Sequence, residues 1–138
     1  MSNNLEQLVL RHLLIDEDYM RKVLPFVKPD YFQGVTRQLF IEIGKFVAKY
    51  NKLPTKEAFK IEIDQSDKFN DDQFTAAVEI LPNIFTKDES DYKWLLDTTE
   101  KWCQDRAIHN AIMESISIID GKHKELTKNA LPELLSKA

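Results

Sequence analysis

The sequence contains few of the residues that interrupt helices or build glycine-rich sites. It has 3 glycines and 5 prolines among 138 residues, and stretches that alternate apolar with polar residues are scarce. Gly34, Gly44 and Gly121 stand apart, and no Gly-Lys-Ser/Thr occurs. A phosphate-binding loop needs several glycines directly before a helix. The sequence therefore predicts an all-α fold, a compact helical bundle, and excludes a P-loop ATPase within these residues.

Residue types that carry chemistry are also sparse. Cys103 is the single cysteine, so no internal disulfide can form, which fits a reducing cytosol. The three histidines are far apart, and no spacing typical of a metal site occurs. Acidic pairs such as Asp71 and Asp72 come at expected helix starts, where they favourably oppose the helix dipole. We expect no catalytic residue, no metal and no cofactor, and hence no enzymatic activity in this chain.

The chain also lacks an excess of basic residues and any long apolar run. Its net charge is −4, and Lys and Arg are interleaved with acidic residues, whereas proteins that bind nucleic acid through phosphates present a basic face. We therefore expect little direct DNA binding. No apolar run approaches the roughly 20 residues that span a bilayer, and the N-terminus lacks the regions of a signal peptide. We expect no membrane association and a cytoplasmic location.

Apolar residues at helical spacing predict several helices before position 86. Side chains that can accept a hydrogen bond from a first-turn amide mark where these helices begin; the expected start residues are Asn3, with Glu6 completing a capping box, Asp16 or Asp18, Thr36, Thr55 and Asn70. Tyr31 and Phe32 are expected to enter the core. Gly44 lies inside a predicted helix, where it costs about 1 kcal/mol relative to Ala, which suggests close helix packing there.

The segment from Ser90 to Gly121 predicts one long helix around which the chain is organised. Ser90 is suited to the N-cap and Gly121 to a left-handed C-terminal end. A broad apolar stripe, the core or partner face, contains Trp94, Leu95, Trp102, Ile108, Ile112, Met113, Ile116 and Ile119. A thinner stripe lies roughly opposite and contains Leu96, Cys103, Ala107, Ala111 and Ile118.

Two apolar stripes suggest that this helix makes contacts on two sides. It is either the central helix of a monomeric bundle or a helix that packs against another subunit. After a polar turn, Leu131, Leu134 and Leu135 begin a further apolar stripe close to the last residue. We therefore expect a globular helical subdomain at 1–88 and a helical hairpin at 89–138 whose second arm is incomplete.

Short stretches along the whole chain carry a resemblance to a known family. They are Leu-Glu-Gln-Leu-Val-Leu at 5–10 with Leu-Leu-Ile-Asp at 13–16, Asp-Tyr-Phe at 30–32, Leu-Phe-Ile-Glu-Ile at 39–43, Leu-Pro-Thr at 53–55 with Ala-Phe at 58–59, and Gln-Asp-Arg-Ala at 104–107 before an isoleucine-rich run. In this order they resemble the N-terminal domain of DnaB-family replicative helicases, closest to the tailed-phage (primase-helicase) versions. Arg11 stands where bacterial members often have Gly, which fits the phage versions better.

The resemblance implies a role in assembly rather than in the motor. In that family the domain forms a collar on a hexameric ring, its hairpins pair between subunits, and primase binds this face. It implies that this chain mediates self-association and primase docking in a phage-infected bacterial cytoplasm. Trp94 and Trp102 are expected to be core anchors. The expected interface residues are Leu96, Cys103, Ala107, Ala111, Ile118, Leu131, Leu134 and Leu135, of which Leu96, Ala107, Ala111 and Ile118 are expected to be exposed on the helix.

Three other functions stay open at this point. The first alternative is a free-standing helical adaptor or regulator that binds a phage or host replication partner. The second is an enzyme with an unrecognised site, which tight small-molecule binding would favour. The third is a helical DNA-binding module, which a steep salt dependence of binding would favour.

Overall fold

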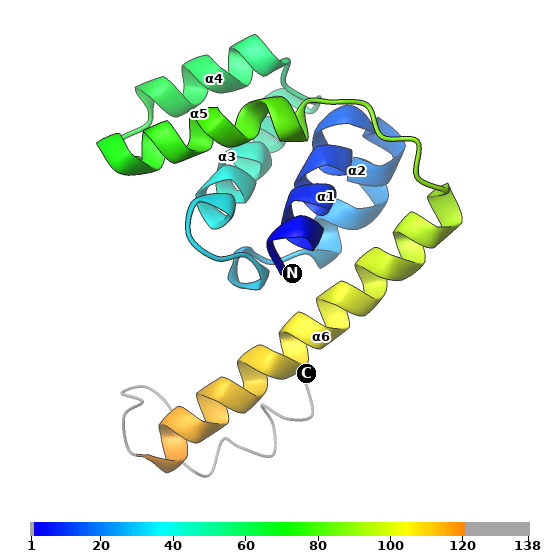
Figure 1. Cartoon of the computed structure of the whole chain (residues 1–138), viewed down its shortest axis with the longest axis vertical. Coiled ribbons are helices and arrows are strands. Elements are labelled where there is room, and N and C mark those ends of the chain that lie inside the picture. Colours follow the sequence, from blue (N-terminus) through cyan, green and yellow to red (C-terminus); the bar gives the residue numbers. More distant parts are fainter. Residues whose placement is uncertain (1, 121–138) are drawn as a thin grey trace. The chain divides into compact units, whose positions relative to one another are not determined.

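The computed structural model describes residues 2–120, and helices make up most of this range (Figure 1). The elements in order are α1 Ser2–Ile15, α2 Glu17–Val23, η1 Leu24–Phe26, η2 Pro29–Tyr31, α3 Val35–Tyr50, α4 Lys56–Gln65, α5 Asp71–Ile84 and α6 Tyr92–Ile119. The described residues contain no strand. The all-α prediction is confirmed.

The chain divides into two compact units, Met1–Trp94 and Leu95–Ala138. Helices α1 to α5 and the first residues of α6 belong to the first unit, and the rest of α6 belongs to the second. The sequence suggested a boundary between 88 and 89, just before this helix. The predicted second arm of the hairpin lies outside the described residues.

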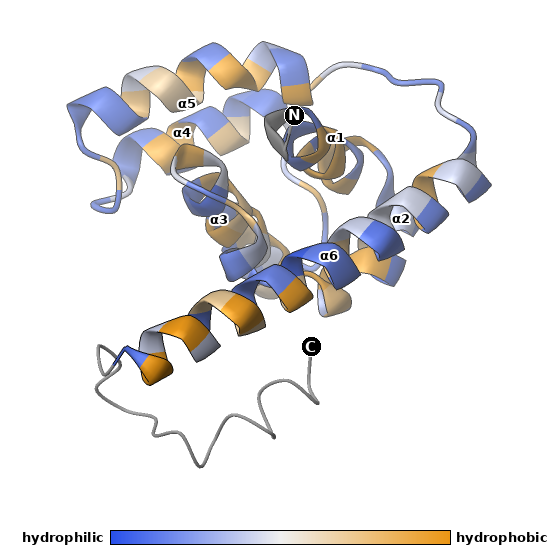
Figure 2. Cartoon of the chain, turned by 60° about the horizontal axis from the view of Figure 1, so that its bottom comes forward, coloured by the Kyte–Doolittle hydropathy of each residue, from blue (hydrophilic) through white to orange (hydrophobic). Residues whose placement is uncertain are grey.

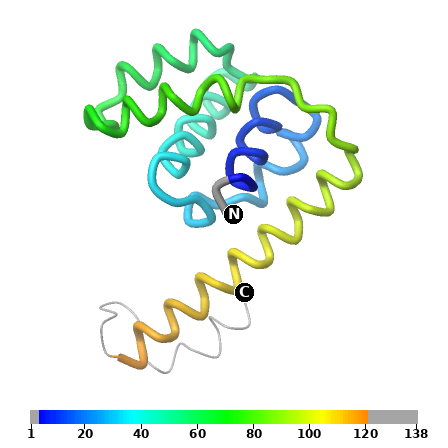
Figure 3. The backbone as a smooth tube through the Cα atoms, in the orientation of Figure 1, coloured from blue at the N-terminus to red at the C-terminus, as the bar shows by residue number. Residues whose placement is uncertain are grey.

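The core of the first unit forms where α1 packs against α2, α3 and α5, while α4 packs against α3 and α5 (Figure 3). Large side chains from these helices are fully buried: Leu10, Leu13, Tyr19, Met20, Leu39, Ile43, Phe59, Ile63, Leu81 and Ile84. Burying each contributes about 1.5–3 kcal/mol. Phe32 stacks on Phe40 with ring centroids 4.8 Å apart, and Tyr31 is also buried, so both predicted core aromatics are confirmed.

Three predicted helix starts are confirmed by their hydrogen bonds. Asp16, Thr55 and Asn70 each accept a hydrogen bond from the backbone amide three positions on, at 3.1, 3.1 and 2.8 Å. Gln73 returns a bond by accepting from the Asn70 N–H at 3.0 Å, which completes a capping box. These short polar side chains therefore fix where α2, α4 and α5 begin.

The capping box predicted at Asn3 and Glu6 is wrong. Helix α1 begins at Ser2, so Asn3 lies inside it. Glu6 is 1% exposed, and its Oε1 accepts from the Gln33 N–H at 2.8 Å and lies 2.7 Å from the Thr36 hydroxyl. A buried carboxylate needs hydrogen-bond donors, and here they come from the segment that leads into α3.

The N-cap predicted at Ser90 is also wrong. Helix α6 begins at Tyr92, and the Asp91 carboxylate accepts from the Trp94 N–H at 2.9 Å. The Ser90 hydroxyl donates to Asp88 instead, at 3.0 Å. Because a carboxylate both accepts the bond and opposes the helix dipole, Asp91 is the better cap.

The two glycines of the first unit have different surroundings. Gly34 has φ +62° and nothing within 4 Å of an added Cβ, and it lets the chain turn so that α3 begins at Val35 rather than at Thr36. Gly44 lies inside α3 and likewise has nothing within 4 Å of an added Cβ. The predicted close helix packing at Gly44 is therefore wrong, since its surface faces open space.

Candidate protein interaction surface

The buried face of α6 changes along the helix. Near its start, Leu95, Thr99 and Trp102 are buried, and near its end Ala111, Ser115 and Ile118 are buried. Within each set the spacing is four and then three residues, which keeps the side chains on one face. From position 95 to 111 an ideal helix makes four full turns and roughly 160° more, so these two positions point in nearly opposite directions. The two buried faces therefore lie on nearly opposite sides of α6.

A row of isoleucines is exposed on the C-terminal half of α6. Ile108, Ile112, Ile116 and Ile119 are 46%, 47%, 46% and 56% exposed, and Met113 beside them is 52% exposed. Their spacing of four, four and three residues places the isoleucines on one face, and Figure 2 shows the apolar colouring gathered in this half of the helix. We call these four residues the isoleucine stripe.

No Asp, Glu, Lys or Arg interrupts the isoleucine stripe, and His109 lies at its edge. Asp105 precedes it and Asp120 follows it on that side of the helix. Between them, Arg106 and Glu114 fall more than roughly 100° away from the centre of the stripe at the helical advance of about 100° per residue. Ser115 sits at the edge of the stripe, and its hydroxyl is bonded to the Ala111 carbonyl at 2.8 Å. The stripe is thus an apolar surface that a second helix can contact without burying a charge.

The structure separates the interface residues expected from the sequence into three groups. Leu96, Cys103 and Ala107 are partly exposed. Ala111 and Ile118 are 8% and 4% exposed, so the expectation that they are exposed on the helix is wrong. Leu131, Leu134 and Leu135 lie outside the described residues.

The two tryptophans of α6 also differ in exposure. Trp102 is 4% exposed, which confirms that it is buried. Trp94 is 49% exposed, so the prediction that it is a core anchor is wrong. Trp94 falls at the same angle around the helix as Ile112, since 18 residues make five turns. The broad stripe seen in the sequence is therefore buried only in part.

Cys103 provides no reactive thiol on this helix. Burial, and then the nearby Glu100 carboxylate, raise the pKa of the Cys103 thiol from 9.0 to about 11. The thiolate is the nucleophilic form, and it is scarce at neutral pH with such a pKa. Cys103 acts as a small apolar side chain.

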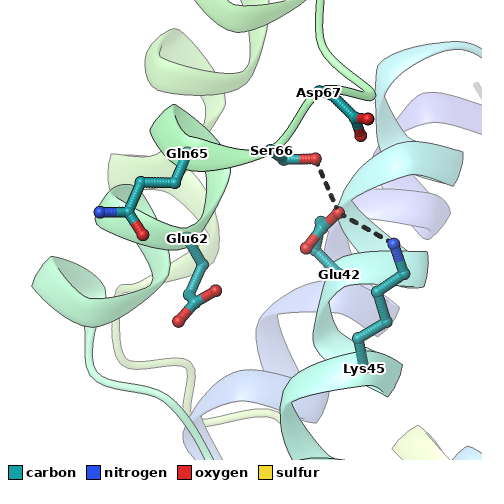
Figure 4. A pocket seen from close by; sticks show the side chains of 6 residues that line it. All are labelled: Glu42, Lys45, Glu62, Gln65, Ser66 and Asp67. Atoms are coloured by element: carbon teal, nitrogen blue, oxygen red, sulfur yellow. Dashed lines mark hydrogen bonds and ion pairs between the residues drawn. The ribbon is translucent and has the colours of Figure 1, made fainter.

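A polar hollow lies between α3 and α4 (Figure 4). It is lined by Glu42, Lys45, Glu62, Gln65, Ser66 and Asp67. The Ser66 hydroxyl donates to Glu42 Oε1 at 3.2 Å, and Lys45 Nζ lies 3.7 Å from the same oxygen. One carboxylate oxygen of Glu42 thus holds both Ser66 and Lys45, and Glu62, Gln65 and Asp67 complete the polar lining.

The described residues also contain no candidate metal site and no candidate membrane span. Between residues 2 and 120, no three His, Cys, Asp or Glu side chains come together as a metal ion would require. None of the described helices combines the length and the apolarity needed to cross a bilayer. The most distinctive surface in this part of the chain is the isoleucine stripe.

The chain has a similar sequence among known proteins. No known protein-family profile matches the chain. The chain is 29% identical over 113 residues to a DnaB-like replicative helicase of Enterobacteria phage T4, a match that covers 81% of this chain and 23% of the relative. The similarity supports a relationship to DnaB-like replicative helicases. The chain thus spans less than a quarter of the length of the relative it matches.

The sequence showed the isoleucines of this stripe, but it led us to expect the exposed interface residues on the thinner stripe instead. These isoleucines form part of the broad apolar stripe, which large side chains mark as the core face of an ordinary surface helix. The signal that separates the isoleucine stripe is local. Its isoleucines recur without interruption at spacings of four, four and three, whereas Ala107 and Ala111, farther around the helix, are small. A stripe drawn along the whole helix hides this difference between its N-terminal and C-terminal halves.

Proposed function

We propose that this chain is the N-terminal collar domain of a phage-type DnaB-like hexameric replicative helicase and that it holds subunits together. The similarity to the helicase of phage T4 supports the family, and the isoleucine stripe of α6 supports the assembly role. ATP hydrolysis and DNA unwinding belong to the motor of the full helicase. The domain itself binds proteins.

The stripe has the properties of a helix-pairing surface. Four β-branched side chains about half exposed on one face leave a continuous apolar strip in water, which soluble monomers rarely present. Their spacing of four, four and three residues is close to the alternation of four and three in the seam of paired helices. Pairing α6 with α6 from a second subunit buries both strips, and the charge-free face leaves no repulsion to overcome.

The mass of the 138-residue chain in solution tests this proposal. Light scattering at increasing concentration should give a mass above that of one chain, and Ile112→Glu should return the mass to that of a monomer while circular dichroism shows unchanged helicity. Ile112 is 47% exposed, so the new carboxylate does not enter the core.

Gln104→Glu is the matched control, because it adds the same charge at an exposed position one turn before the stripe. It should leave the mass unchanged. A wild-type chain that stays monomeric at every concentration, or an Ile112→Glu variant with the wild-type mass, would contradict the assembly role of the stripe.

The proposal also includes primase docking on the first unit. Phe26 in η1 is 73% exposed, the largest exposed fraction among the large apolar side chains of the described residues. Exposed aromatic residues often dominate binding energy once a partner covers them. Calorimetry with the cognate primase should show at least tenfold weaker binding for Phe26→Ala than for the wild type.

Ile61→Ala is the control for this measurement, because Ile61 on α4 is also exposed, at 55%. It should bind primase like the wild type. Absence of any binding by the wild-type chain would contradict primase docking, and equal binding by the two variants would contradict the assignment to Phe26.

A further inference from the structure

Beyond Phe85, whose ring centroid lies 5.9 Å from that of Phe59, the connection that joins α5 to α6 has no apolar anchor. From Thr86 to Trp94, no residue is buried. Leu81 and Ile84 before it and Leu95 after it are all about 1% exposed or less. Attachment of this connection to the rest of the first unit therefore depends on polar contacts, which water can replace more readily than it can replace buried apolar ones. We call residues 86–92 the strap.

The first polar contact of the strap is made with α1. Asp88 Oδ2 lies 2.8 Å from His12 Nε2 and 3.6 Å from Arg11 Nη1. Arg11 Nε also donates to the Asn83 carbonyl at 2.8 Å. The hydrogen bond to His12, followed by that to Ser90, lowers the pKa of the Asp88 carboxyl. One carboxylate thus receives donors from α1 and from the strap itself.

The second polar contact is made with α2. The Tyr92 hydroxyl donates to Asp18 Oδ2, Lys22 Nζ lies 3.4 Å from the same carboxylate oxygen, and the ammonium is also 5.3 Å from the centre of the Tyr92 ring. These three side chains are exposed or partly exposed. Contacts between exposed charges are weak and are screened by salt.

We propose that the strap detaches reversibly from the rest of the first unit. Asp88 attaches it to α1 and Tyr92 attaches it to α2, and both contacts open together while the core of the first unit stays folded. Seven residues joined at two points behave as one unit, because losing one contact lets the chain move away from the other. An open strap leaves Tyr92, the first residue of α6, without its contact to α2. The inference does not depend on the proposed function, since it concerns contacts within residues 1–94 alone.

Trypsin cleavage after Lys87 tests whether the two contacts are coupled. Lys87 is exposed at the α1 end of the strap, and a protease must pull several residues out of their contacts to cut there. Asp18→Asn weakens the contact at the other end without changing the strap sequence, because the neutral amide is a poorer acceptor for the Tyr92 hydroxyl and no longer pairs with Lys22. We expect it to accelerate cleavage after Lys87 at least threefold, with a similar acceleration of the wild-type chain in 0.5 M salt after correction for protease activity.

Glu17→Gln is the matched control, because Glu17 lies next to Asp18 in the first turn of α2 and pairs with Arg21 at 3.2 Å rather than with the strap. It should cleave at the wild-type rate. If Asp18→Asn is cleaved after Lys87 at the wild-type rate, the two contacts are not coupled and the proposal is overturned. Equal acceleration in Asp18→Asn and Glu17→Gln would also contradict it, because it would show that α2 itself had loosened.

Hydrogen exchange then tests whether the core stays closed. Asp88→Asn should speed exchange of the amides of residues 95–97 severalfold, since these belong to the first turns of α6, while amides of α1 and α3 exchange as in the wild type. Equal acceleration in α1 and α3 would overturn the proposal, because the strap would then be part of the cooperative core. Both measurements use the whole 138-residue chain and no partner, so their result is separate from that of the self-association experiment.

Discussion

Glu6 of α1 and Thr36 of α3 lie within hydrogen-bond distance although 30 residues separate them, with 2.7 Å between Glu6 Oε1 and Thr36 Oγ1. The Thr36 hydroxyl is also 2.7 Å from the Gln33 carbonyl, and Glu6 accepts from the Gln33 amide. One buried carboxylate thus ties α1 to the turn that starts α3. Such a network stabilises a fold only while every member keeps its partner.

The Thr36→Val substitution should therefore destabilise the protein by about 1–3 kcal/mol, because it removes the hydroxyl and leaves the buried Glu6 carboxylate with one donor fewer. Urea denaturation followed by circular dichroism measures the loss. Thr75→Val is the control, since the Thr75 hydroxyl bonds a carbonyl on an exposed turn of α5 and should cost less than about 0.5 kcal/mol. Equal losses in the two variants would contradict the role of the Glu6 network.

The two glycines of the first unit should respond to alanine in opposite ways. Gly44→Ala should stabilise the protein by about 0.5–1 kcal/mol, because the helix interior favours Ala and an added Cβ meets nothing within 4 Å. Gly34→Ala should destabilise it despite equal space, because φ +62° strains a residue with a Cβ. Thermal unfolding measures both. A destabilised Gly44→Ala would restore the close packing first expected at that position.

Acid should weaken the contribution of Asp88 selectively. The pKa of Asp88 is lowered in the folded protein, chiefly by the hydrogen bond to His12; Arg11 is the other charged group of α1 that faces it. A lowered pKa means that the carboxylate contributes stability above the ordinary value of 3.8 and that this contribution disappears as the pH falls through the folded value.

The difference in melting temperature between the wild type and Asp88→Asn, measured from pH 5.5 down to pH 2.5, should therefore shrink below about pH 3.8. Glu89→Gln removes a neighbouring exposed carboxylate and should show a small difference throughout. A difference for Asp88→Asn that stays constant with pH would contradict the assigned cause.

The Cys103 thiol should react slowly with alkylating reagents. Its pKa rises from 9.0 to about 11, so at pH 8 it carries roughly a hundredfold less thiolate than a thiol with the unshifted pKa. Iodoacetamide labelling followed by mass spectrometry should be correspondingly slow in the native chain and fast in urea. Native labelling as fast as that of free cysteine would contradict the burial.

Local hydrogen bonding made several helix starts predictable. Asp16, Thr55 and Asn70 are each followed directly by a helix whose third amide needs an acceptor, and no other side chain competes for it. Glu6 could not be predicted in this way, because its partners, Gln33 and Thr36, are distant in sequence. Tertiary contacts decided that position against the local pattern.

Exposure along α6 could be predicted only in part, for a related reason. Apolar spacing identified the helix and both of its stripes. It could not show that Trp94 is exposed while Leu95 is buried, nor that Ala111 is covered while Ile112 is half open, because those outcomes depend on what lies beside each turn. The fold class follows from the pattern of the chain, whereas the choice of surface requires the neighbours.

Because the two halves of α6 bury opposite faces, the angle between these faces depends on the number of residues between the halves. Each residue turns the helix by about 100°, so the stretch from Trp102 to Ile108 fixes the angle at which the isoleucine stripe is presented relative to the side buried at Leu95. Adding or removing a single residue there would swing the stripe by more than a quarter turn while leaving every side chain of the stripe intact. The number of residues in this stretch therefore encodes an orientation as well as a distance.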